Sequence, residues 1–354
     1  MSRPLTDLSQ ARPFVAAAVQ AAPVYLDAEA TAEKVAGLVR EAAGNGAELV
    51  AFPEVFIAGY PYWNWVMTPL EGSAWFERLQ LSSVGLEDPA IEIVRRAARE
   101  AGVVVVVGIN ERSPHSVGAI YNTTLTIEAD GELVGVHRKL VPTWAEKLTW
   151  APGDASGLKV HQTKVGPLGV LACGENTNPL ARFSLLAQGE LVHVAGYISL
   201  PVAPPEYDMA AAIRLRGMTH SFEGKVFTVI SCSTISDEIL DTIAADDAGR
   251  RELMSRTHSA FSGVIGPDGA EIGESLIDTE GIVYAEIDLR RCIQPKQMHD
   301  VIGGYNRFDV FDLQVDTRPR TPVRLRSALP ADEWPGAPAA AEEADSEERK
   351  SDDR

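Results

Sequence analysis

Cysteine is scarce in this chain, with three residues among 354, at positions 173, 232 and 292. Their odd number and wide spacing support neither a disulfide framework nor a CxxC zinc site. Long apolar runs are also missing: none approaches the roughly 20 residues that span a bilayer, and the opening MSRPLTDLSQARPF lacks the apolar centre of a signal peptide. We therefore expect a soluble, cytoplasmic protein without a membrane partner, in which one cysteine can serve as a working thiol.

Basic residues are the minority charge. Lys and Arg number 32 against 50 Asp and Glu, a net charge of −18 that would repel the phosphate backbone of a nucleic acid. The excess is uneven, because residues 331–354 hold nine acids and three bases. This composition predicts a disordered acidic C-terminal tail over 331–354 and excludes nucleic acid as an expected partner.

The sequence motifs of several enzyme classes are absent. No HExxH, GxSxG, GxGxxG or P-loop pattern occurs, and the seven histidines do not recur at metal-ligand spacing. Metal, serine-triad and dinucleotide chemistry therefore lose support, and we expect neither a metal nor a cofactor.

Short β-branched runs alternate with helical stretches, which is typical of an α/β protein. The pattern predicts helices over about 28–43 and 90–101, and antiparallel hairpins within 119–139 and 261–274, where Ala-Asp-Gly and Pro-Asp-Gly signal the turns. With 45% hydrophobic residues and no linker-like break, the chain predicts one large domain over 13–324.

The most informative segment is VGPLGVLACGENTNPLARF, where a buried-looking strand ends at Cys173 and Asn178-Pro179 opens a helix. Strand, tight turn and helix is a geometry that presents nucleophiles. A helix N-terminus nearby would favour thiolate, and the Gly174 amide would be an oxyanion donor. The alternative is a small buried cysteine closing a core strand, the role that we expect of the other two cysteines.

Two further segments put charges among apolar neighbours. Glu54 follows an apolar strand directly in AFPEVF, where desolvation would raise its pKa toward that of a base. Lys139 and Glu146 lie seven apart in RKLVPTWAEKLTW. Each alone also fits a surface charge or a structural ion pair, and Glu175 fits a partner of a nearby arginine such as Arg182.

Taken together, these segments resemble the nitrilase superfamily of carbon–nitrogen hydrolases, whose pattern is Glu, Lys and Cys in that order. The resemblance covers about 13–320 and includes AAAVQAAPVYLD, FPEVFIAGYP, VPTWAEKLTWAPGD and GGYNRFDVFDLQVD. It implies an αββα sandwich with Glu54 as base, Lys139 as stabiliser of negative charge and Cys173 as nucleophile. Glu146 matches the family's additional glutamate and is expected to support Lys139.

The long FPE and RKL segments look more like true nitrilases than like the amidase and carbamoylase branches. The implied reaction converts an organic nitrile to a carboxylic acid and ammonia through a cysteine thioimidate and thioester. Tyr60, Trp144 and Tyr197 are the expected pocket residues. The resemblance also implies a homo-oligomer, with the helices after Cys173 and Pro205 as interface elements.

One departure stands beside the nucleophile: many nitrilases carry Trp, Glu and His there, whereas this chain has Gly174, Glu175 and Asn176. Three alternatives therefore remain at this stage. An amidase or N-carbamoyl hydrolase would use the same three residues, a hydratase-like enzyme would stop at the amide, and a catalytically silent scaffold would bind a partner.

Overall fold

The computed structural model describes residues 7–204 and 206–323. Residues 1–319 form one compact unit. The tail predicted over 331–354, and residue 324 at the end of the predicted domain, lie outside the described residues. Within the part that is described, no helix is both long enough and apolar enough to cross a membrane.

Two six-stranded sheets form the centre of the unit. The first has the order β12-β1-β2-β3-β4-β5. Strands β1, β2 and β3 are parallel, whereas β4, β5 and β12 join by antiparallel pairing. Its strands are β1 (Phe14–Gln20), β2 (Ala47–Ala51), β3 (Val104–Arg112), β4 (Ile120–Ile127), β5 (Leu133–Arg138) and β12 (Gly281–Ile287).

The second sheet has the order β11-β10-β9-β8-β7-β6 and repeats this arrangement, with three parallel strands at its centre. Antiparallel strands flank them on both sides. Its strands are β6 (His161–Thr163), β7 (Gly166–Ala172), β8 (Val192–Tyr197), β9 (Phe227–Cys232), β10 (Phe261–Ile265) and β11 (Leu276–Ile277).

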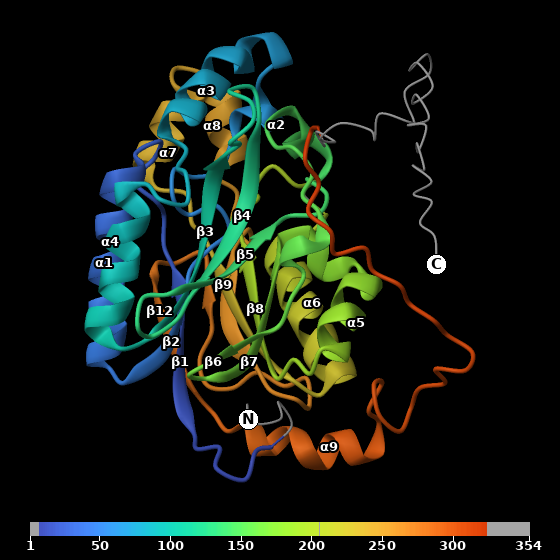
Figure 1. The fold of residues 1–354 in the computed structure, drawn as a ribbon. Coiled ribbons are helices and arrows are strands. Elements are labelled where there is room, and N and C mark those ends of the chain that lie inside the picture. Colours follow the sequence, from blue (N-terminus) through green and yellow to red (C-terminus); the bar gives the residue numbers. More distant parts are fainter. Residues whose placement is uncertain (1–6, 205, 324–354) are drawn as a thin grey trace, which may run out of the picture. The chain divides into compact units, whose positions relative to one another are not determined.

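Alternation along β1 shows how the layers are built. Ala17 and Val19 pack with the helices α1 (Ala28–Gly44) and α4 (Pro89–Ala101), whereas Ala16 and Ala18 face the second sheet. Successive strand residues point to opposite faces, so a strand covered on both sides must be apolar throughout. Helices α5 (Pro179–Ala187) and α6 (Met209–Gly224) cover the outer face of the second sheet (Figure 1). The predicted αββα sandwich is confirmed.

The predicted helices and hairpins are found with small differences. Strands β4 and β5 form the first hairpin, with a register shift between Thr126 and Ile127. In the second, Ile265 and Glu271 form only an isolated bridge, so that predicted hairpin is incomplete. The remaining helices are α2 (Trp63–Val66), α3 (Pro69–Ser82), α7 (Asp237–Ala244), α8 (Ala248–Met254) and α9 (Ile293–Met298).

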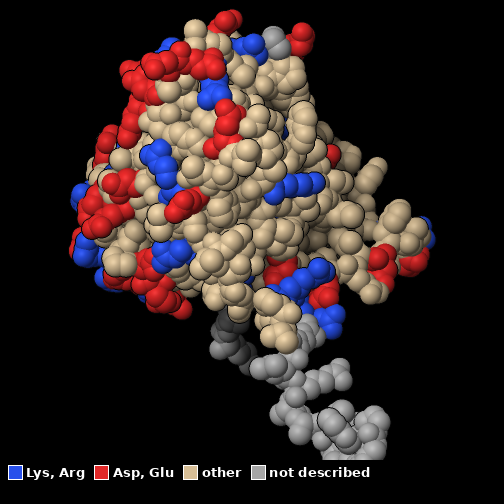
Figure 2. All heavy atoms as spheres, turned by 90° about the horizontal axis from the view of Figure 1, so that it is seen from above, with Lys and Arg blue, Asp and Glu red and all other residues tan. Residues whose placement is uncertain are grey.

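Charged side chains are unevenly spread over the molecule. Seen from above, Asp and Glu gather mainly along the left margin (Figure 2), the side on which Figure 1 places α1 and α4. Much of the remaining face carries neither acidic nor basic side chains. The acidic excess of the sequence therefore does not form one continuous coat over this face.

Candidate active site

Glu54 follows the C-terminal end of β2 in a tightly packed turn. Its side chain is 2% exposed, and the next residue, Val55, has φ +42°, a left-handed conformation that a β-branched residue rarely adopts. The turn lies directly on β3: a Cβ on Gly108 would come within 2.2 Å of the Val55 nitrogen. Only a glycine at position 108 therefore allows β3 to pack this closely against the turn that carries Glu54.

Lys139 lies directly after β5 and bridges two carboxylates. Its Nζ donates to Oε1 of Glu54 at 2.8 Å and to Oε2 of Glu146 at 2.7 Å. The side chain is 1% exposed, and Asn122 on β4 also donates to Oε1 of Glu54, at 2.7 Å. The other oxygen of Glu54, Oε2, is buried and has no hydrogen-bond partner among residues 7–204 and 206–323. One carboxylate oxygen is thus held in place while the second is free to take a proton.

Glu146 is fixed from several sides. It accepts from Lys139, from the Thr143 backbone at 2.6 Å and from the Tyr60 hydroxyl at 3.1 Å. Tyr60 in turn accepts from the Trp65 indole at 2.9 Å. The hydroxyl of Tyr60, expected in the pocket, is therefore used to orient Glu146.

Burial and pairing set the charges of this group. Desolvation raises the pKa of Glu54, against the lowering effect of Lys139. For Lys139, burial alone would lower the pKa, but the charges of Glu146 and Glu54 raise it well above its ordinary value. Lys139 is therefore a permanent cation, and Glu54 is a stronger base than an exposed glutamate.

Cys173 is the first residue after β7, with φ +44° and 7% exposure. It opens a 3₁₀ turn, Cys173–Thr177, so α5 begins only at Pro179. Burial raises the pKa of the thiol well above its usual range, Glu54 raises it further, and Lys139 opposes both. The expectation that a helix N-terminus favours the thiolate stays a prediction, and in the structure burial acts in the opposite direction on the pKa of the thiol. The resting group is a neutral thiol, and a base must remove its proton.

Gly174 does not have a left-handed backbone; Cys173 has it instead. A Cβ on Gly174 would come within 2.9 Å of the Thr143 hydroxyl. The space beside Cys173 is therefore occupied by Thr143, whose backbone amide donates to Glu146.

Glu175 has a different partner from the one expected. It accepts from His137 at 3.0 Å, from the Leu140 amide at 2.7 Å and from the Ala172 amide at 2.9 Å. Arg182 pairs with Glu223 instead. The expected contact between Glu175 and Arg182 is wrong. Glu175 instead connects the turn that begins at Cys173 to the segment around Lys139.

A buried chain of polar groups beneath the turn was missed in the sequence. The Asn176 amide donates to the carbonyls of Cys173 at 3.0 Å and Leu171 at 3.2 Å, and its oxygen faces Nε2 of His193 at 2.8 Å. The Nδ1 of His193 faces Glu190 at 2.7 Å. Both ring nitrogens of His193 are thus used, and the ring links the turn after Cys173 to Glu190.

His220 completes this cluster by donating to the second oxygen of Glu190 at 2.9 Å. Although burial alone would raise the pKa of Glu190, His193 and His220 lower it to about 2. Burial and the neighbouring His193 lower the pKa of His220 to about 4. Ligand atoms of the three residues lie within 4.8 Å of one another, a spacing that suits a metal, but hydrogen bonds already occupy them. The only sequence signal was polar residues inside apolar stretches.

The two remaining pocket candidates differ sharply in burial. Tyr197, at the end of β8, is fully buried in the cluster that contains Cys173, and its hydroxyl has no partner. Trp144 is 80% exposed, and its ring meets Trp65 edge to face. Tyr197 thus belongs to the buried cluster of Cys173, whereas Trp144 lies at the surface.

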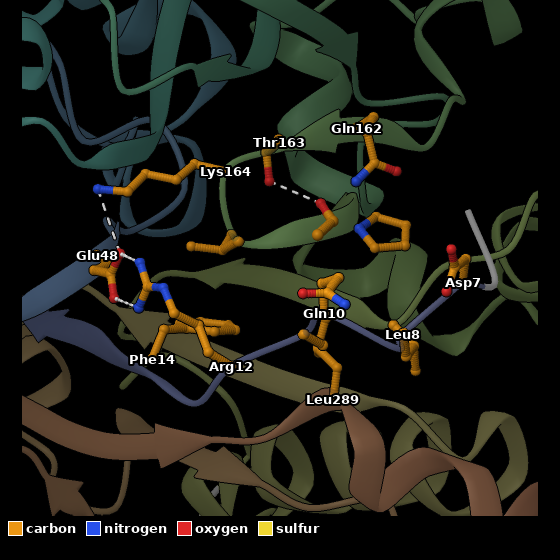
Figure 3. Close-up of a pocket in the computed structure, with 14 residues that line it drawn as sticks. Asp7, Leu8, Gln10, Arg12, Phe14, Glu48, Gln162, Thr163, Lys164 and Leu289 are labelled. Carbon is orange, nitrogen blue, oxygen red and sulfur yellow. Dashed lines mark hydrogen bonds and ion pairs between the residues drawn. The ribbon is translucent and has the colours of Figure 1, made fainter. Parts of the chain in front are cut away.

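An open pocket of about 380 Å³ lies elsewhere, between the N-terminal segment and the turn of β6 and β7 (Figure 3). Three of its charged residues pair with one another: Glu48 binds Arg12 at 2.6 Å and Lys164 at 3.3 Å. None of the expected site residues lines it. This pocket is therefore separate from the cluster of Glu54, Lys139 and Cys173.

The chain is similar to proteins of a known family over most of its length. The family model for carbon-nitrogen hydrolases matches residues 15–297. An aliphatic nitrilase from Rhodococcus rhodochrous is 39% identical over 315 residues, covering 88% of this chain and 84% of the relative. A nitrilase from Paraburkholderia phymatum is 34% identical, covering 89% and 90%.

Solved structures show the same fold. A carbon-nitrogen hydrolase from Helicobacter pylori G27 has a TM-score of 0.64 at 21% identity, covering 84% of this chain and 97% of that one. Nit3 from Saccharomyces cerevisiae, a member of branch 10 of the nitrilase superfamily, has a TM-score of 0.65 at 19% identity, covering 85% and 97%. The chain belongs to the carbon-nitrogen hydrolase family.

Proposed function

We propose that this protein is a nitrilase that hydrolyses a small organic nitrile to a carboxylic acid and ammonia, with Cys173 as nucleophile. One observation carries the proposal: a buried neutral thiol lies within the field of a carboxylate, Glu54, whose Oε2 has no hydrogen-bond partner. Lys139 holds the other oxygen and keeps the base in place. The names of the relatives, nitrilase and aliphatic nitrilase, favour a nitrile over an amide.

The reaction follows from these charges. Glu54 accepts the thiol proton as sulfur attacks the nitrile carbon, and Lys139 stabilises the negative nitrogen with the one ammonium hydrogen that the two carboxylates leave free. The proton returns to nitrogen, which gives a thioimidate. Water then adds at the same carbon, ammonia leaves, and a second water hydrolyses the thioester to release the acid and the thiol.

Glu146 is a positioning residue in this scheme. It neutralises Lys139 without touching the thiol, and an unpaired buried ammonium would cost several kcal/mol. The Gly174 amide is the proposed second donor to the developing anion, on the model of an oxyanion hole.

The test is product formation from a panel of nitriles beside the corresponding amides, with acid, amide and ammonia all quantified. We expect nitriles to yield mainly acid, and Cys173→Ala to abolish turnover while the protein stays folded. Cys232→Ala is the matched control, since this second buried cysteine lies in β9. Turnover of amides but not nitriles would overturn the nitrilase assignment, and hydrolysis by the Cys173→Ala variant would overturn the mechanism.

Two finer expectations belong to the same proposal. We expect a homo-oligomer assembled through α5 and α6, which sedimentation of the purified protein would test. Leu180 on α5 and Leu215 on α6 are more than half exposed and offer apolar surface for such contacts. We also expect the protein in the cytoplasm, which cell fractionation would test.

A further inference from the structure

Arg216 lies on α6 over the nucleophile turn. Met209 and Ile213, seven and three residues before it on the same helix face, pack in the cluster that contains Cys173. The Nε of Arg216 donates to the hydroxyl of Thr177, the last residue of the turn, at 2.8 Å, and Nη2 donates to the Tyr207 hydroxyl at 3.1 Å. Two of the three guanidinium nitrogens, Nε and Nη2, are thus held by hydrogen bonds.

The third nitrogen of this guanidinium, Nη1, is not hydrogen-bonded within the described part of the chain. Its Nη1 is buried without a hydrogen-bond partner, and no carboxylate of residues 7–204 or 206–323 forms an ion pair with it. Both of its hydrogen bonds go to neutral hydroxyls, so its charge is not compensated. Arg214, two residues earlier, is exposed and paired with Glu271. A partly buried cation without an anion is costly unless a ligand supplies the anion.

Tyr197 presents a second unused polar group at the same place. In the parallel pairing of β7 and β8, Ala172 lies opposite Gly196, so Cys173 and Tyr197 are the next residues at the two strand ends. Tyr197 is fully buried in the cluster of Cys173, yet its hydroxyl has no partner. Buried hydroxyls are normally hydrogen-bonded, so an empty one beside a nucleophile indicates a place for a ligand oxygen.

An open hollow borders this cluster on one side. Met209 and Leu200, which belong to or pack on the cluster of Cys173, also line an open hollow of about 630 Å³, and Tyr207 lies in the same wall. The electrostatics agree with the geometry: burial raises the pKa of Cys173, and Arg216 is among the cations that oppose the rise.

We propose that Arg216 Nη1 and Tyr197 Oη form a subsite for a carboxylate, so that the preferred substrate is a nitrile carrying a carboxylate on a short chain. This inference rests on the proposed nitrilase function and names its substrate class. The two donors hold the anionic end, while Cys173 attacks the cyano carbon at the other end. Lys139 does not compete for that anion, because Glu54 and Glu146 already neutralise it.

The kinetic test compares cyanoalkanoates of one to four methylenes with the matching methyl ketones, in which CH3 replaces O−. Arg216→Gln should raise KM for the best cyanoalkanoate by roughly 10- to 100-fold, the loss of a hydrogen bond to a charged group, and leave the ketones nearly unchanged. Tyr197→Phe should have a smaller effect of the same kind. Arg216→Lys keeps the charge and part of the preference. Arg214→Gln, the matched control on the same helix, should change neither series.

A second measurement is independent of nitrile turnover. Iodoacetate and iodoacetamide alkylate the same thiol and differ in one charge, and the modified Cys173 peptide is quantified by mass spectrometry. Arg216→Gln should lower the ratio of the two rates about 10-fold, and Arg214→Gln should not.

The outcomes separate the two proposals. An equal loss for cyanoalkanoates and ketones would mean that Arg216 acts on the thiol and would overturn the subsite, as would an unchanged alkylation ratio. If no nitrile is hydrolysed but the ratio still falls in Arg216→Gln, the nitrilase assignment fails and the anion subsite stands.

Discussion

Replacing Lys139 by methionine tests the buried charge network. The variant keeps the side-chain length but leaves Glu54 and Glu146, each 2% exposed, without their shared cation. Removing one partner of a buried pair costs about 3–5 kcal/mol. The unfolding entropy grows with chain length, and for a chain of this length a stability loss of 1 kcal/mol lowers Tm by about 1.5 °C. We therefore expect Tm to fall by roughly 5–8 °C near pH 8.

The loss should depend on pH with a definite sign. Desolvation raises the pKa of Glu54 even beside Lys139, and removal of the cation raises it further. A carboxyl whose folded pKa lies above its unfolded value stabilises the fold fully below the unfolded pKa, and that stability is lost as pH rises toward the folded pKa. The gap in Tm between Lys139→Met and wild type should therefore be small near pH 5 and largest near pH 8.

The assay is thermal unfolding of both proteins between pH 5 and pH 8. Lys164→Met is the control, because Lys164 is partly exposed and its pair with Glu48 is a surface contact that contributes at most about 1 kcal/mol. Lys139→Met/Glu146→Gln should recover part of the loss, since it removes one of the two carboxylate charges. A gap in Tm that is independent of pH, or no gap at all, would refute the reasoning.

Three further predictions concern the turn and its base. Glu54→Gln should reduce kcat by roughly 10²–10⁴-fold, as expected for a positioned base, and a mild effect in steady-state kinetics would displace it from that role. His193→Leu removes the hydrogen-bond partner of the Asn176 side-chain oxygen and should lower the free energy of unfolding in urea by about 1–3 kcal/mol. Alkylation of Cys173 should also become slower. Unchanged values would show that His193 does not hold the turn that begins at Cys173. Gly174→Trp must displace the Thr143 hydroxyl, so we expect its acid-to-amide ratio, measured by mass spectrometry, to change more than its Tm, and identical ratios would contradict this.

The approximate ends of two strands could be predicted, because each apolar run in the sequence stops near the end of its strand. Apolar runs ending at Glu54 and at Cys173 predicted strands; β7 ends where its pattern stops, and β2 ends at Ala51, two residues before the end of its pattern. The pairing of Lys139 with Glu146 was also accessible, since two opposite charges enter one apolar stretch seven residues apart. These features are local, and local patterns of hydrophobicity specify local structure.

The protonation states were not predictable in the same way. A thiol before a helix suggested a thiolate, but burial raises the pKa of Cys173, and only the packed structure determines how much water remains around it. Glu175 illustrates the same limit: its partner, His137, comes from the other sheet, 38 positions away. Nothing in the order of residues indicates which of several nearby charges will meet a given carboxylate.

The sequence by itself determined which residues are candidates for chemistry and on which strand ends they lie, because those depend on residue type and short-range pattern. Only the tertiary structure decided which of these candidates have polar atoms without a hydrogen-bond partner. Glu54 Oε2, Tyr197 Oη and Arg216 Nη1 are unpartnered because of the way two sheets and α6 pack around them. Hydrogen bonding is satisfied or left open by groups distant in sequence, so the unsatisfied atoms that define this site exist only in the folded protein.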